Sequence, residues 1–145
     1  MRISAKGEYA IKAVLDLAMH RTGALVPIQE IAARQSIPQR YLEQVLLALK
    51  RAGLLTSKRG SSGGYHLTRN PEDITVGEVL RAVEGSSAPF EAMGRGRHVR
   101  DGQDLVDLWN EISEAVSGVV DRLTFGDLAA RAAERRGAAR PMYHI

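Results

Sequence analysis

Residues 27–52 read PIQEIAARQSIPQRYLEQVLLALKRA, and this stretch decides the fold. It holds two runs of apolar residues at helical spacing, and only a short break at residues 35–37 separates them. A proline stands at the start of each run, at Pro27 and Pro38, where a missing backbone N–H costs a helix little. Two helices joined by so tight a turn, with the second one amphipathic, predict a helix-turn-helix.

The second helix of this pair separates apolar from polar residues. Its apolar side, which must face the core, holds Leu42, Val45, Leu46 and Leu49. Its opposite side holds side chains that can hydrogen-bond base edges or phosphates, with a tyrosine in the first turn: Arg40, Tyr41, Glu43, Gln44 and Arg51. We therefore expect the polar side to contact DNA. For Glu43 an ion pair with Arg40 on a solvated surface is an equally open alternative.

A predicted β-hairpin follows this helix directly. Residues 54–58 and 65–68 read as strands, and the glycine-rich segment 59–64 lies between them. Glycine lets the backbone approach a phosphate closely, and an arginine at the tip, here Arg59, suits the negative potential of a narrow minor groove. A hairpin directly after a helix-turn-helix is the order of a winged helix. The alternative for Arg59 is a hairpin tip that only keeps the surface soluble.

Helices are also predicted on both sides of this unit. Ser4 can cap a first helix that ends near His20. Residues 74–79 contain a capping box and a hydrophobic staple for a helix that stops at Gly85, and residues 123–128 repeat that design for a last helix that ends near Arg136. Residues 85–102 have no periodicity and form a loop of unusual length, which is typical of a functional or disordered segment.

A regular apolar repeat marks residues 103–123. The apolar residues step by four, three, four, three and four positions, which is a heptad pattern: Leu105, Trp109, Ile112, Val116, Val119 and Leu123. A helix this long has more apolar surface than so small a domain can cover. We therefore expect it to pair with the same helix of a second chain, and the alternative is ordinary packing within one chain.

Composition excludes several classes of site. The 145 residues include no cysteine, so the chain cannot form disulfides, thiolate nucleophiles or metal and cluster sites that need thiolates. The four histidines are far apart in the sequence, and we expect no metal site: His20, His66, His98 and His144. No Ser-His-Asp arrangement, phosphate-binding loop or carboxylate pair stands out, so we expect no enzyme.

The charge and the hydropathy of the chain are compatible with a cytoplasmic protein that binds an anionic partner. The net charge is only +3, but basic residues cluster just before an acidic run: Lys50, Arg51, Lys58, Arg59 and Arg69. Such a cluster is compatible with DNA binding or with an ordinary solvated face. No apolar stretch is long enough to cross a membrane, and the first residues lead into an amphipathic helix that is unlike a signal peptide. We therefore expect the protein to stay in the cytoplasm.

With these elements in place, the sequence resembles the IscR/NsrR/CymR family of bacterial winged-helix regulators, also called the Rrf-two family. The resemblance covers residues 1 to about 134, and five short segments carry it: residues 6–10, 41–44, 53–55, 59–65 and 76–79. It implies a mostly α fold with a small β-hairpin wing, a winged helix-turn-helix plus a long dimerisation helix. Residues 1–84 would bind DNA, 85–102 form the loop, 103–136 hold the dimerisation helix and a final short helix, and 137–145 form a mobile tail.

The resemblance also implies a function, that of a homodimeric transcription regulator, and we expect a repressor. It would bind double-stranded DNA at a pseudo-palindromic operator, with Arg40, Tyr41, Glu43 and Gln44 toward the major groove. Arg59 would enter the minor groove, and further contacts would come from Arg51, Lys58, Ser61, Ser62 and Gly63. Pro38 and Arg40 depart from some relatives, so the operator sequence does not transfer.

Many members of this family hold an iron–sulfur cluster on cysteines of the loop before the dimerisation helix. The corresponding positions here fall on or near residues without thiolates, and we expect no cofactor: Glu91, Arg97, Gln103 and Val106. A small molecule or a partner protein could then be the effector. Relatives without cysteines include regulators that respond through a protein partner, so an interaction module is the alternative function.

Overall fold

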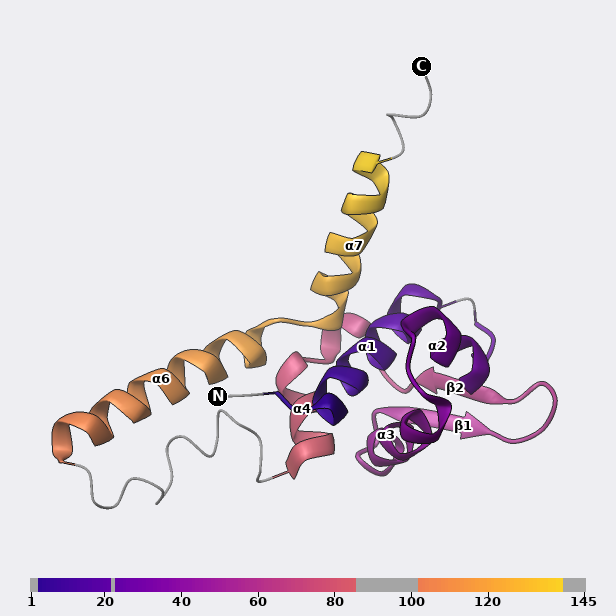
Figure 1. Ribbon diagram of the computed structural model, residues 1–145. Coiled ribbons are helices and arrows are strands. Elements are labelled where there is room, and N and C mark those ends of the chain that lie inside the picture. The colour runs from indigo at the N-terminus through magenta and orange to yellow at the C-terminus, as the bar shows by residue number, and fades with distance from the viewer. Residues whose placement is uncertain (1–2, 22, 86–101, 140–145) are drawn as a thin grey trace.

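The computed structural model describes residues 3–21, 23–85 and 102–139 (Figure 1). Its elements follow in the order α1 (Ala5–Met19), α2 (Ile28–Gln35), α3 (Gln39–Arg51), β1 (Leu55–Lys58), β2 (Gly64–Leu67), η1 (Pro71–Asp73), α4 (Val76–Glu84), α6 (Gln103–Arg122) and α7 (Phe125–Ala139). Within these ranges the chain is mostly helical with one two-stranded antiparallel hairpin, which confirms the predicted fold class. The 3-10 turn η1 was not predicted.

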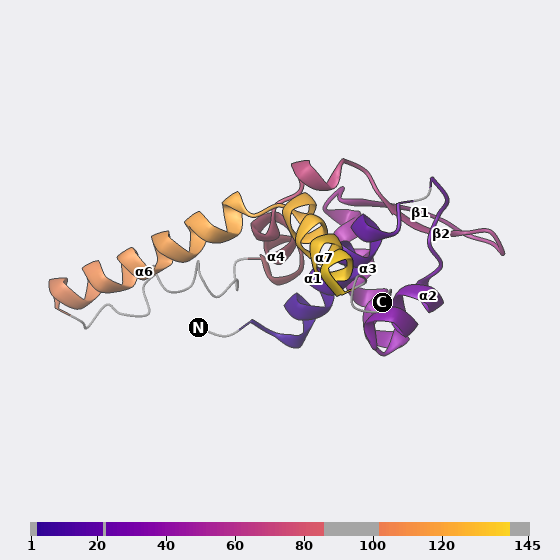
Figure 2. The ribbon, with the colours of Figure 1, turned by 90° about the horizontal axis from the view of Figure 1, so that it is seen from above.

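Helix α1 lies at the centre of the packed part of the chain. It contacts α2, α3, α4, α7 and β2. Ala10, Ala13, Val14 and Leu17 are buried along one side of α1, at the spacing that places them over successive turns. Small residues at Ala10 and Ala13 let the neighbouring helices approach closely. The core therefore surrounds α1, and α6 extends away from it (Figures 1 and 2).

A buried carboxylate fixes α2, the first helix of the helix-turn-helix, against α1. Asp16 is fully buried, and Arg34 donates to both of its oxygens at 3.0 and 2.9 Å. Gln35 donates a further hydrogen bond of 3.0 Å to Asp16. The hydrogen bond to Asp16 is also the main cause that raises the pKa of Arg34 above its ordinary value. Because α2 has only one buried residue, Ile31, these polar contacts hold much of its position.

The turn between α2 and α3 is as short as predicted. Ser36 adopts a left-handed conformation with φ 54° and ψ 45°, which is uncommon for a residue other than glycine. The Ile37 N–H donates to the Ala32 carbonyl at 3.0 Å and closes the turn. Helix α3 begins directly after Pro38, so this closed turn fixes the position of its first residues.

The two strands of the hairpin pair with each other, and β2 also pairs with Val26, just before α2. In the β1–β2 register Leu55 pairs with Leu67 and Lys58 with Gly64. Tyr65 and Val26 exchange two backbone hydrogen bonds of 2.9 and 2.8 Å. A Cβ at Gly64 would collide with the Val26 carbonyl, so this close approach requires glycine. The hairpin therefore lies at a set distance from the N-terminus of α2.

The two repeated cap motifs lie side by side. Thr75 and Glu78 form the predicted capping box at the start of α4. Thr124 and Asp127 exchange the same pair of hydrogen bonds, of 3.0 and 3.1 Å, at the start of α7. Thr75 and Thr124 are bridge partners between these segments. This bridge fixes the point at which α6 leaves the core.

One predicted boundary was wrong. We expected the last helix to end near Arg136, but α7 continues to Ala139. Gly137 lies within the helix because one exposed glycine costs a helix only about 1 kcal/mol relative to alanine. The rest of the predicted tail, residues 140–145, and most of the predicted 85–102 loop lie outside the described residues. Among the described helices, none is long and apolar enough to span a bilayer.

Candidate nucleic-acid interface

The outward face of α3 is a ridge of exposed side chains. At about 100° per residue, Arg40, Gln44, Leu47 and Arg51 fall within one narrow sector of the helix, and all four are exposed. The opposite sector holds the buried residues Leu42, Val45, Leu46 and Leu49. We call the four exposed residues the α3 crest. Since the core fixes the opposite side, the crest is presented to solvent in a fixed orientation.

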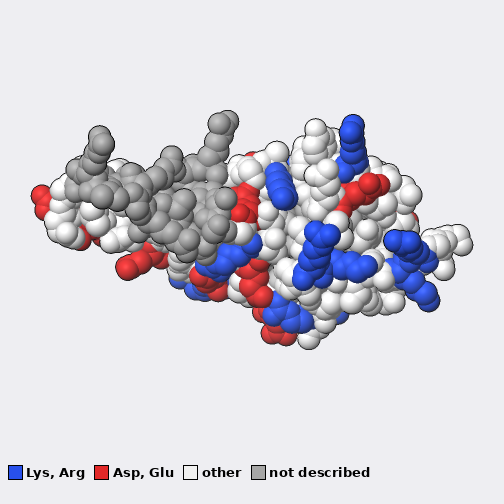
Figure 3. All heavy atoms as spheres, turned by 90° about the horizontal axis from the view of Figure 1, so that it is seen from below, with Lys and Arg blue, Asp and Glu red and all other residues white. Residues whose placement is uncertain are grey.

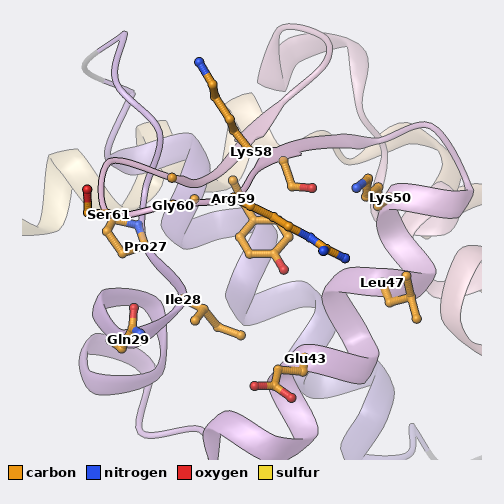
Figure 4. Close-up of a pocket in the computed structure, with 14 residues that line it drawn as sticks. Pro27, Ile28, Gln29, Glu43, Leu47, Lys50, Lys58, Arg59, Gly60 and Ser61 are labelled. Carbon is orange, nitrogen blue, oxygen red and sulfur yellow. The ribbon is translucent and has the colours of Figure 1, made fainter.

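An open cavity of about 580 Å³ separates α3 from the hairpin. Glu43, Leu47 and Lys50 line it from α3, and Lys58 and Arg59 line it from the hairpin (Figure 4). Figure 4 shows the Arg59 side chain extending from the hairpin into this space, on the side where Glu43 and Leu47 lie. We call this space the wing-side cavity. It brings together side chains that are far apart in the sequence.

The first turn of α2 also lines the wing-side cavity. Pro27, Ile28 and Gln29 lie along its edge, and the α2 N-terminus has no side-chain cap. The first N–H groups of a helix have no partner within it and carry partial positive charge, which favours a phosphate nearby. An anion in this cavity could therefore interact with the N-terminus of α2 as well as with the basic side chains.

Positive charge gathers on this side of the molecule. Figure 3 shows Lys and Arg side chains over the half of one face that lies toward α3 and the hairpin, with acidic side chains mostly toward α6. In the described part of the chain, Arg40, Arg51, Lys58 and Arg59 make no ion pair. An Arg40 pair with Glu43, the alternative that the sequence left open, is also not formed there. These cations are therefore available to phosphates.

The sequence-predicted contact residues lie on α3 and in the hairpin that follows it. Those on α3 and the hairpin are exposed, with the exception of Gly63: Arg40, Tyr41, Glu43, Gln44, Arg51, Lys58, Arg59, Ser61 and Ser62. Gly63 is buried in the hairpin tip, where its N–H donates to the Gly60 carbonyl at 3.0 Å. A Cβ on Gly63 would collide with the Lys58 carbonyl, so its backbone shapes the tip.

Sequence reasoning missed Leu47 and the start of α2. Leu47 is 46% exposed and lies on the crest between polar side chains. The signal was present, because Leu47 falls outside the helical repeat of the buried residues. Ile28 and Gln29 were missed for another reason: only the fold brings them beside the hairpin.

Five of the predicted dimer residues lie on α6, which has no fully buried residue, and Leu123 directly follows its last turn. Leu105 and Val119 are each 45% exposed, and Leu108, which was not predicted, is 41% exposed. Trp109, Ile112, Val116 and Leu123 are half-buried, and two of these, Val116 and Leu123, pack against the core of their own chain. The apolar residues of α6 thus divide between the chain's own core and solvent.

The residues of this chain do not fit a cysteine-ligated iron–sulfur cluster. Such clusters need several thiolates, and the whole sequence contains none. Of the positions that the resemblance assigned to cluster ligands, Gln103 and Val106 lie on α6, and Glu91 and Arg97 lie outside the described residues. Within the described ranges no group of three or more His, Cys, Asp or Glu side chains could hold a metal.

Comparison with known proteins gives consistent matches over most of the chain. Residues 3–131 match the family described as "Rrf2: Iron-dependent Transcriptional regulator". The HTH-type transcriptional regulator IscR of Photobacterium profundum is 39% identical over 129 residues, which cover 88% of this chain and 75% of that protein. IscR of Klebsiella pneumoniae is 38% identical, with 88% and 79% covered.

Two solved structures are similar in fold and in sequence. CymR, titled the global cysteine regulator of B. subtilis, superimposes with a TM-score of 0.79 and 32% identity, covering 90% of this chain and 98% of that one. T. potens IscR superimposes with a TM-score of 0.77 and 35% identity, covering 93% and 90%.

Proposed function

This chain belongs to the Rrf2 family of DNA-binding transcriptional regulators, and we propose that it binds a pseudo-palindromic operator as a homodimer. The relatives it matches are regulators and not enzymes. In the proposed complex the α3 crest lies in the major groove and the hairpin is the wing, with Arg59 in the adjacent minor groove. We further propose that the chain is a repressor.

The wing-side cavity between α3 and the hairpin is the observation that best supports these contact residues. One flank of α3, the first turn of α2 and the basic hairpin surround the wing-side cavity, which the α3 crest borders through Leu47. The cations on its rim make no ion pair within the described residues. The strand of DNA that separates a major groove from the next minor groove would run through this cavity. Phosphate contacts there would position the protein, and the crest would read base edges.

The apolar residues that α6 leaves in solvent support the proposed homodimer. Leu105, Leu108 and Val119 are large, exposed and on one helix. A second copy of α6 would cover them, and the two-fold symmetry would place two α3 helices on half-sites about one helical turn apart, or a multiple of it. The input that controls binding would be a small molecule or a partner protein, because the chain has no thiolate for a cluster.

The first test replaces one residue of the wing and one of the crest. Arg59→Ala should weaken operator binding and leave folding intact, because Arg59 is exposed and unpaired within the described chain. Gln44→Ala should alter base preference at a cost of about 1–3 kcal/mol if Gln44 makes a paired base contact. Gel-shift titrations at several salt concentrations measure both effects.

The control is Arg135→Ala on α7, which removes the same charge from an exposed position far from α3 in the sequence. Its affinity should equal that of the unmodified chain. If Arg59→Ala and Gln44→Ala also bind normally, the DNA contact lies elsewhere. Binding that does not weaken as salt rises would instead support the alternative of a protein-interaction module.

A further inference from the structure

A second cavity borders α3 on the side away from the hairpin. Its volume is about 450 Å³. Three residues of the first turns of α1 line it, together with three residues of α3: Ala5, Lys6, Tyr9, Tyr41, Gln44 and Val45. We call it the α1-side cavity. Gln44 of the crest forms part of its wall, so the cavity begins where the proposed base-reading surface ends.

The two cavities lie on opposite flanks of one helix. Glu43 and Lys50, which line the wing-side cavity, lie on one side of the crest. Tyr41 and Val45, which line the α1-side cavity, lie about 160° or more around the helix from Glu43 at 100° per residue. The crest lies between these flanks. A helix with this surface has one hollow on each side.

The major groove of DNA has a matching shape. It is about 12 Å wide and admits one α-helix, and a sugar–phosphate backbone forms each of its two walls. A helix inserted there has one backbone on each flank. Resting on the proposed function, we propose that the α1-side cavity receives the second backbone of the operator, with Lys6 donating to a phosphate.

The chemistry of the cavity suits a sugar–phosphate chain. Lys6 is exposed and makes no ion pair with any described residue. Tyr41 is 57% exposed, and Tyr9 is half-buried against the core. Deoxyribose has apolar edges, and the phosphates between the sugars are anionic. Aromatic walls with one cation at the edge are complementary to that alternation, and the two phenol groups supply further hydrogen-bond donors.

The first turn of α1 is held in place for such a contact. The Ser4 hydroxyl accepts a hydrogen bond from the Gly7 N–H at 3.1 Å and donates to Glu84 of α4. Gly7 is buried, and a Cβ there would lie 3.2 Å from a methyl group of Leu80. The backbone that carries Lys6 is therefore tied to α4. The backbone at Lys6 is therefore already ordered, and a phosphate contact by its side chain costs little further conformational entropy.

The test compares Lys6→Gln with Lys12→Gln on the operator that the chain selects from its own genome. Both positions are exposed on α1, but only Lys6 lines the cavity. Each phosphate contact contributes about 0.9 to the slope of log affinity against log salt. With two subunits bound, Lys6→Gln should lower the magnitude of this slope by about 1.8. Lys12→Gln should leave it unchanged.

A phosphate scan locates the contact. Neutral methylphosphonate linkages are placed one at a time along each strand of a half-site. We expect one or two such positions, on the strand that the wing-side contacts do not touch. At these positions the neutral linkage should lower the affinity of the unmodified chain, and it should not lower the affinity of Lys6→Gln any further. An unchanged salt slope for Lys6→Gln, or equal losses for both chains at every linkage, would overturn the proposal.

These outcomes are separate from those of the proposed function. If the unmodified chain selects no operator, the proposed function fails before Lys6 is tested. If it binds and its salt slope is the same in Lys6→Gln, only the inference about the α1-side cavity fails, and a small-molecule occupant of that cavity becomes the better explanation. Thermal unfolding of both variants should match that of the unmodified chain because both side chains are exposed.

Discussion

Leu47 is the one apolar side chain among the four residues of the α3 crest. It is 46% exposed, and its neighbours along the crest are Gln44 and Arg51. The C5-methyl group of thymine is the apolar feature of the major groove, and apolar side chains contact it. We therefore propose that Leu47 selects thymine at one position of each half-site.

Replacing each thymine of the half-site by deoxyuridine removes only that methyl group. At one position the unmodified chain should lose about three- to fourfold in affinity, the worth of one buried methyl group at about 0.8 kcal/mol. Leu47→Ala should bind more weakly and no longer respond to deoxyuridine there, and Leu47→Met should respond as the unmodified chain does. Fluorescence anisotropy titrations measure these losses. Equal responses in Leu47→Ala and the unmodified chain would contradict this role.

At the scale of elements, signals local in the sequence predicted most of the fold. The capping boxes at Thr75 and Thr124 gave correct helix starts, because a cap depends on residues three positions apart. Contacts between distant residues were not predictable in this way. The Asp16–Arg34 pair and the Thr75–Thr124 bridge join segments whose approach only the folded chain determines. The α1-side cavity was missed for the same reason.

The heptad pattern of residues 103–123 predicted a helix but not which of its sides faces a partner. In the structure the C-terminal part of α6 packs against α4, and Arg81 binds Asp121 through two hydrogen bonds of 2.6 and 3.0 Å. Val116 packs against the core of its own chain. We therefore expect the partner to contact a neighbouring stripe of α6, which keeps three predicted residues and adds Leu108 and Ala115: Leu105, Leu108, Ile112, Ala115 and Val119.

The double variant Leu108→Asp, Val119→Asp should therefore give a folded monomer. Both side chains are more than 40% exposed, so charge there disrupts association with little effect on the core. Val116→Asp should instead destabilise the chain itself, because it places a charge against buried residues. Sedimentation velocity and thermal unfolding separate the two effects. Glu111→Gln on the same helix is the control and should stay dimeric. A double variant that still sediments as a dimer would rule out this stripe.

For the molecule as a whole, the main difference from the description of its family is the missing iron ligand set. The family is described as iron-dependent, and this chain has no cysteine. Oxygen ligands do not replace thiolates in iron–sulfur clusters. We expect anaerobic purification with iron and sulfide supplied to give a colourless protein that still shifts operator DNA. Stoichiometric iron with a visible charge-transfer band would contradict this expectation.

We propose that a dimer of this chain reads DNA through the α3 crest and the hairpin. The most direct measurement is selection of fragments from its own genome by the purified chain, followed by sequencing, with an Arg59→Ala, Gln44→Ala double variant in parallel. We predict that the unmodified chain enriches an inverted repeat whose half-sites are about one helical turn apart, or a multiple of it, and that the folded double variant does not. Fragments without a shared repeat would contradict binding to a specific operator. The same repeat enriched by both chains would show that Arg59 and Gln44 do not read it.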